Sequence, residues 1–133
     1  MTIIVGYVPT KEGRAALSAA ASEARLRGTK LVVINSNRGG KDLDAEEASR
    51  YERELESVKA QLDEAGVEHQ VRQLVRGMEP AEDLVAVAQE TDATLIVIGL
   101  RRRTPVGKLI LGSNAQRILL EAPCPVLAVK AAD

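Results

Sequence analysis

Short runs of apolar residues alternate along this chain with longer segments in which apolar positions recur every three or four residues. Continuous apolar runs rich in valine and isoleucine occur at residues 2–8, 30–35, 94–98 and 126–129. Such runs are typical of strands buried on both faces of a parallel sheet. The segment Glu68–Val75 alternates only weakly, which favours an edge strand with one face in water.

The segments between these runs have the spacing of amphipathic helices. A narrow, alanine-rich apolar face predicts a helix that Thr10 can cap and that Gly28 can end. A long helix is expected over residues 45–65, with the apolar positions Tyr51, Leu55, Val58 and Leu62. Pro80 is expected at the first position of a third helix, where its missing N–H costs nothing. A fourth helix is expected at Ser113–Glu121.

Strands that alternate with helices predict a single α/β domain over residues 1–133. Helical crossovers between parallel strands are right-handed and place helices on both faces of the sheet. Ligands of such sheets bind beyond the carboxyl ends of the strands, where the winding direction reverses. We therefore look for a site in the loops that follow the strands.

Composition narrows the class of partner. The chain has 45% apolar residues, two tyrosines, no other aromatic residue and a net charge of -1. The core must be aliphatic, and single-stranded nucleic acid finds no aromatic stacking platform. A DNA- or RNA-binding protein would show a basic excess, so no nucleic-acid partner is expected.

The residue types needed for catalysis, metal binding or membrane insertion are scarce. Cys124 and His69 are the only cysteine and histidine, so no Cys/His dyad is in view and the ligands of a zinc site are not available. His69 is expected at the surface. The glutamates between residues 46 and 56 are interleaved with basic residues, as on a solvated helix face. No run approaches the ~20 apolar residues of a membrane span. A lone thiol and no signal segment suggest a cytoplasmic protein.

The stretch Gly99–Asn114 is the main candidate for a binding site. It joins a buried strand to the last helix, has glycine near each end, and contains three consecutive arginines at residues 101–103. The N–H groups at a helix N-terminus make a ready anion site, and arginines can pair with phosphate. The spacing alone is equally compatible with a surface loop that binds nothing. In that case the arginines are solvated and the glycines are needed only for the backbone conformation. A P-loop is excluded because Arg102 and Leu109 stand where it needs Gly and Ser or Thr.

The same stretch resembles the universal stress protein family. ATP-binding members carry Gly, two residues, Gly, nine residues, Gly and then Ser or Thr after the fourth strand, and Gly99, Gly112 and Ser113 match that pattern. The Gly77–Pro80 step and the segment Ala122–Val129 are also similar to the family. The resemblance extends over the whole chain.

This resemblance implies a five-stranded parallel sheet of order 3-2-1-4-5 with helices on both faces, the adenine nucleotide alpha hydrolase-like fold. It implies a stress-response regulatory module and not an enzyme, an adenine nucleotide (ATP with Mg²⁺) as ligand, and a homodimer through the strand Pro125–Lys130. The implied nucleotide-binding residues are Tyr7, Val8, Pro9, Thr10, Asn35, Gly99, Arg101, Arg102, Gly112, Ser113 and Asn114.

Two departures keep an alternative open. Val8-Pro9-Thr10 stands where ATP-binding members have Asp-Gly-Ser, and Arg102 replaces the second glycine. The alternative is a family member that binds no nucleotide and acts through protein contacts. A receiver-type signalling domain is disfavoured because acidic residues are missing after the first and third strands. An adenylating enzyme is disfavoured because no Ser-Gly-Gly-x-Asp-Ser loop is present.

Substitution of Arg102 should change the affinity for ATP, and the direction of the change distinguishes two roles of this side chain. If its guanidinium pairs with phosphate, Arg102→Ala weakens ATP binding by ~1–3 kcal/mol, the scale of a charge-assisted hydrogen bond. If its side chain instead fills the site, Arg102→Gly strengthens binding. Titration calorimetry on both variants measures the sign. Unchanged affinity in both would show that the side chain is merely solvated.

Overall fold

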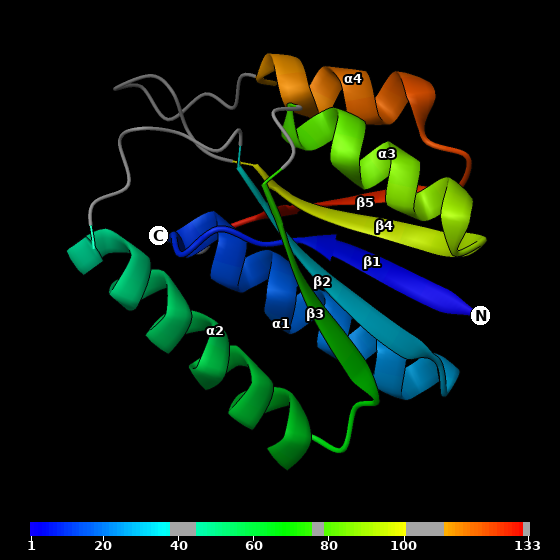
Figure 1. Cartoon of the computed structure of the whole chain (residues 1–133). Helices are drawn as coiled ribbons and strands as arrows, with labels where there is room; N and C mark the ends of the chain where they lie inside the picture. Colours follow the sequence, from blue (N-terminus) through cyan, green and yellow to red (C-terminus); the bar gives the residue numbers. More distant parts are fainter. Residues whose placement is uncertain (38–44, 76–78, 101–110, 132–133) are drawn as a thin grey trace.

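The structure is a computed structural model, and it describes residues 1–37, 45–75, 79–100 and 111–131. Strands and helices alternate along the whole chain (Figure 1). In order, the elements are β1 (Thr2–Gly6), α1 (Lys11–Arg27), β2 (Lys30–Asn37), α2 (Ala45–Glu64), β3 (His69–Val75), α3 (Pro80–Glu90), β4 (Ala93–Leu100), α4 (Ser113–Glu121) and β5 (Val126–Lys130).

The five strands form one parallel sheet in the order β3-β2-β1-β4-β5, which confirms the expected fold. β1 is central, and its Ile4 is in register with Val32 of β2 and Ile96 of β4. The chain winds outward from β1 in both directions. The reversal of winding therefore lies between β1 and β4, as the strand order implied by the family resemblance requires.

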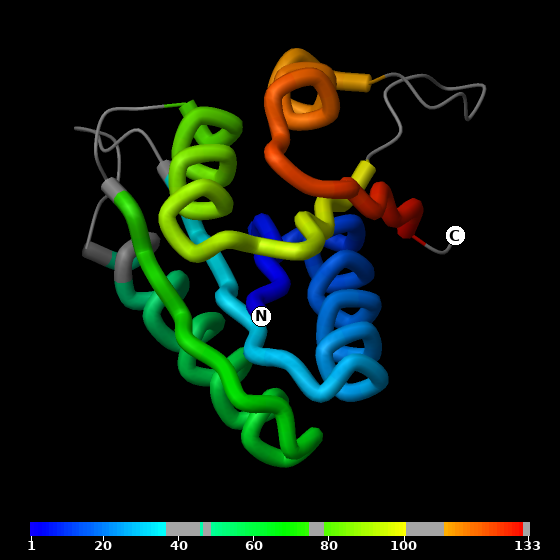
Figure 2. The backbone as a smooth tube through the Cα atoms, turned by 90° about the vertical axis from the view of Figure 1, so that its right-hand side faces the viewer, coloured from blue at the N-terminus to red at the C-terminus, as the bar shows by residue number. Residues whose placement is uncertain are grey.

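Each face of the sheet has its own apolar core. α1 and α2 cover the face that carries Val5, Val33 and Val97, and alanines of α1 allow its close approach. α3 and α4 cover the opposite face, which carries Ile4, Val32 and Ile96. Figure 1 and Figure 2 show these two helix pairs on either side of the sheet. The continuous apolar runs in the sequence reflect this burial on both faces.

The helix boundaries agree with the predicted signals. Thr10 caps α1 through its hydroxyl oxygen, which accepts the Gly13 N–H at 3.1 Å. Gly28 ends α1 in the left-handed region with φ 61°, and Gly66, with φ 73°, follows α2. Pro80 is the first residue of α3.

Two strand ends differ from the sequence prediction. β1 ends at Gly6 and not at Val8, because the chain turns after the Tyr7 N–H has bonded to the Ile34 carbonyl at 2.9 Å. β2 extends to Asn37, beyond its apolar run, because its polar end pairs with β3 in the register Asn37↔Val75. β2 therefore continues past its last apolar residue, because its backbone still pairs with β3.

The first turn of α1 packs directly on backbone. A Cβ added at Gly13 would lie 1.8 Å from the Val8 carbonyl oxygen, and one at Gly99 would lie 2.3 Å from the Glu12 carbonyl oxygen. Neither position has room for a side chain, and in each case the obstacle is main chain that cannot rotate away. These two glycines therefore fix the start of α1 against the β1–α1 turn and against β4.

Gly13→Ala should destabilise the fold although alanine is the better helix former. The clash with Val8 costs about 1–3 kcal/mol, the scale of overpacking, and outweighs a propensity gain of about 1 kcal/mol. Urea unfolding followed by circular dichroism measures the change. Ser18→Ala, on the exposed face of the same helix, is the control and should change stability by a few tenths of a kcal/mol. A stabilised Gly13→Ala protein would contradict the contact.

Candidate functional site

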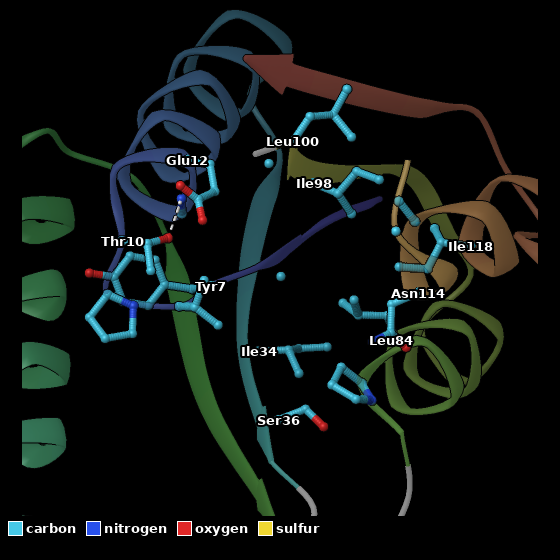
Figure 3. A pocket seen from close by; sticks show the side chains of 18 of the residues that line it. Tyr7, Thr10, Glu12, Ile34, Ser36, Leu84, Ile98, Leu100, Asn114 and Ile118 are labelled. Atoms are coloured by element: carbon cyan, nitrogen blue, oxygen red, sulfur yellow. Dashed lines mark hydrogen bonds between the residues drawn. The ribbon is translucent and has the colours of Figure 1, made fainter. Parts of the chain in front are cut away.

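A cavity of about 490 Å³ lies at the carboxyl ends of β1, β2 and β4. Its volume falls within the range of small-molecule sites. The β1–α1 turn forms one wall, and the beginnings of α3 and α4 form the opposite wall (Figure 3). Ile34, Leu84, Ile98 and Ile118 supply its apolar surface. The cavity is therefore at the winding reversal, where the fold predicts a ligand.

The β1–α1 turn is held by backbone and by a buried amide. The Thr10 N–H donates to the Val8 carbonyl at 2.8 Å, which folds the chain tightly over Pro9. Asn35 Nδ2 donates to the Tyr7 carbonyl at 3.0 Å. Asn35 is 3% exposed, and its Oδ1 has no partner among the described residues. The Asn35 side chain thus supports the wall of the cavity from behind and does not line it.

Tyr7 connects the end of β1 to α2. Its hydroxyl donates to a carboxylate oxygen of Glu54, and Arg14 Nη2 lies 3.4 Å from the same oxygen. Burial, reinforced by the Glu54 carboxylate, raises the pKa of Tyr7 above its ordinary value. The phenol therefore remains a hydrogen-bond donor at neutral pH, and its ring forms part of the cavity wall.

A buried carboxylate supports the opposite wall. Asp83, on α3, is 0% exposed and accepts a hydrogen bond from the hydroxyl of Ser36, which lines the cavity. A buried carboxylate needs such partners because desolvation of its charge is costly. Sequence reasoning missed this pair. One signal was present, since Asp83 lies four residues before the buried Val87 and thus on the inner face of α3.

Three helices begin at the cavity, and they differ in how their N–H groups are satisfied. α1 is capped by Thr10. The Ala81 N–H of α3 donates to Asn114 Oδ1 at 3.2 Å. α4 begins after Gly112, which has no side chain, and within the described residues no side chain caps its first amides. The N–H groups of α4 thus remain available to an anion in the cavity.

Most of the predicted site residues meet at this cavity. Its lining includes Tyr7, Val8, Pro9, Thr10, Gly99, Gly112, Ser113 and Asn114. Arg101 and Arg102 lie outside the described residues. The sequence did not point to Glu12, Ser36 or Tyr51, which also line the cavity from separate elements. At Gly99, the contact with the Glu12 carbonyl is by itself a sufficient reason for glycine.

The two residues considered for redox or proton chemistry lie away from the cavity lining. His69 is half-buried at the start of β3, with Nδ1 2.8 Å from the Val67 carbonyl oxygen. Cys124 is half-buried against the α3–α4 core, and burial raises the pKa of its thiol. Within the described ranges, no cluster of three or more His, Cys, Asp and Glu could hold a metal ion. No helix in the same ranges is long and apolar enough to cross a membrane.

Known proteins match this chain over nearly its whole length. The family model described as the universal stress protein family matches residues 1–130. A curated universal stress protein from Mycolicibacterium smegmatis is 48% identical over 130 residues, which cover 96% of each chain.

Two solved structures from Archaeoglobus fulgidus are also similar, and each alignment covers 98% of both chains. One is a universal stress protein with 39% identity and a TM-score of 0.84. The other is the universal stress protein in complex with dAMP, with 34% identity and a TM-score of 0.79. Together with the sheet order and the cavity at the winding reversal, these matches show that the chain belongs to the universal stress protein family.

Proposed function

We propose that this chain is a regulatory protein of the stress response that binds an adenine nucleotide in the cavity, with the phosphate at the N-terminus of α4. The observation that carries the proposal is the start of α4, which no side chain of the described residues caps and which faces a cavity of suitable volume. The similar Archaeoglobus fulgidus protein was solved with dAMP, which supports the same class of ligand here.

ATP with Mg²⁺ is the form of the ligand that we propose. Among the described residues that line the cavity, no basic side chain is available to neutralise a triphosphate. The partial positive charge at the start of α4 compensates part of the charge, and Mg²⁺ bound to the phosphates compensates more. Arg101 and Arg102 belong to the same proposed site on sequence grounds.

A regulatory role fits the polar groups of the cavity better than catalysis. Tyr7 and Ser36 line the cavity, and the hydroxyl of each donates a hydrogen bond to a carboxylate of the fold, Glu54 and Asp83. Such pairs hold walls in place and leave ligand binding to backbone N–H groups.

Cytoplasmic location remains part of the proposal, on the evidence of one unpaired thiol, Cys124.

A second candidate function is partner binding without a nucleotide. The observation in its favour is Val8, which is 44% exposed at the turn where ATP-binding members carry an aspartate. The cavity would then be a vestige, and protein contacts would carry the function.

We also propose that the chain forms a homodimer through β5. β5 is an edge strand, and its Leu127 is 37% exposed. Leu119 and Leu120 of α4, which precedes β5 in the chain, are 44% and 85% exposed. An antiparallel partner strand would satisfy the open edge and cover part of this apolar surface, as a two-fold interface requires.

Gly112→Val should abolish nucleotide binding. Its side chain would enter the cavity at the first amides of α4 and exclude the phosphate. Titration calorimetry with ATP and Mg²⁺ should give binding heat for the wild type and none for the variant. Leu111→Val, one residue earlier and outside the cavity lining, is the control and should bind like the wild type. No heat from the wild type at millimolar ATP would support partner binding without a nucleotide.

Ala128→Pro should break the dimer and preserve the fold. The Ile96 N–H donates to the Pro125 carbonyl at 3.0 Å, so by alternation the backbone groups of Leu127 point to β4 and those of Ala128 point to the open edge. Proline at position 128 thus removes a donor only from the dimer interface. Leu127→Pro is the contrasting variant and should destabilise the fold.

Sedimentation equilibrium at tens of micromolar, together with thermal unfolding, tests this prediction. We expect a dimeric wild type and a folded, monomeric Ala128→Pro protein. A monomeric wild type, or an Ala128→Pro protein that stays fully dimeric, would place the interface elsewhere or exclude it.

A further inference from the structure

We propose that Glu12 selects ribonucleotides over deoxyribonucleotides, with its carboxylate accepting hydrogen bonds from the two hydroxyls of the ribose. This inference rests on the proposed nucleotide binding and adds a specificity determinant to it. Glu12 stands in the first turn of α1 and lines the cavity. It is the only charged side chain in the described lining.

The Glu12 carboxylate has no partner within the described residues, although it is half-buried. Several other glutamates of the helices are paired. Glu23 lies 3.1 Å from Arg27, Glu54 accepts from Tyr7, and Glu121 lies 3.0 Å from Arg117. A half-buried carboxylate at a cavity has lost part of its hydration without gaining a partner in the fold. A ligand that donates hydrogen bonds would supply the missing partners.

The backbone of Glu12 is held firmly. Its carbonyl oxygen and Cβ lie 2.3 Å and 3.1 Å from the position that a Cβ on Gly99 would take, so α1 and the end of β4 are in direct contact. The next residue, Gly13, donates its N–H to the cap at Thr10. Binding therefore does not require ordering of the backbone that carries the carboxylate, which favours a defined ligand contact.

The position of Glu12 relative to α4 decides which part of a nucleotide it can meet. Figure 3 shows Glu12 beside Thr10 on one wall and Asn114 on the opposite wall, where α4 begins. Phosphate is attracted to the α4 end and repelled by a carboxylate. Glu12 must then face a neutral portion of the ligand. A vicinal diol offers two O–H donors to the two oxygens of a carboxylate, which accepts and cannot donate.

The test compares nucleotides that differ only in the ribose hydroxyls. Titration calorimetry in the presence of EDTA uses AMP, 2′-deoxy-AMP and 3′-deoxy-AMP, so that no divalent cation contributes. For the wild type we expect AMP to bind about tenfold more tightly than either deoxy form, which is the scale of one hydrogen bond to a charged group. In Glu12→Ala both hydrogen bonds are lost, so AMP affinity should fall about 100-fold and the affinity of each deoxy form, which keeps one ribose hydroxyl, about tenfold. Glu12→Gln, which removes the charge, should lower the preference for AMP in the same direction.

The matched control is Glu23→Gln, an acidic position on the same helix outside the cavity, which should retain the preference for AMP. Thermal unfolding checks that each variant folds. An unchanged ratio of AMP to deoxy affinity in Glu12→Gln would overturn the inference, and so would an equal loss for all three nucleotides. Preserved binding with an unchanged ratio leaves the proposed nucleotide function intact. If the wild type binds none of the three nucleotides, this inference fails, and the titration with ATP and Mg²⁺ decides the proposed function separately.

Discussion

The arrangement of the site depends on the backbone contacts that the first turn of α1 makes with the β1–α1 turn and with the end of β4. Gly13 lies against the Val8 carbonyl and Gly99 lies against the Glu12 carbonyl, and neither position has room for a Cβ. These contacts set where α1 begins, and hence where the β1–α1 wall of the cavity stands. The alanine-rich face of α1 extends the same close approach along the sheet. A larger residue at either glycine would move the helix and the wall together.

Hydrogen bonds of buried and half-buried polar groups hold the remaining parts of the cavity walls in place. Asn35 holds the Tyr7 carbonyl from behind the turn, Glu54 holds the Tyr7 hydroxyl, and Asp83 holds Ser36 on the far wall. Each bond joins elements that are distant in sequence, and the last two span 47 residues each. Such bonds add little net free energy but are costly to break on one side only, since the remaining group stays buried and unpaired. They therefore serve to hold one geometry of the cavity walls.

The sequence predicts the elements better than it predicts the site. Apolar runs and helix stop signals identify the strands and helices because burial on both faces leaves a direct record in each segment. The order of the strands came from the family resemblance. Apolar periodicity does not identify Glu12, Ser36 and Asp83, because their roles depend on how separate elements meet in space. Gly13 likewise looks like an ordinary helix residue until the turn at Val8 is known.

The N-termini of α1, α3 and α4 give a reason why the fold leaves a cavity between them. Each helix end brings unsatisfied N–H groups, and a fold that buried all three against one another would leave them without acceptors. α1 uses Thr10, and α3 uses Asn114 of α4, so each of those ends is satisfied by a side chain. Asn114 therefore caps its neighbour, and no side chain among the described residues caps the first amides of α4. With the Glu12 carboxylate on the other wall, the cavity has one end that attracts anions and one that attracts hydrogen-bond donors. A ligand that places phosphate and hydroxyl groups at its two ends satisfies both at once.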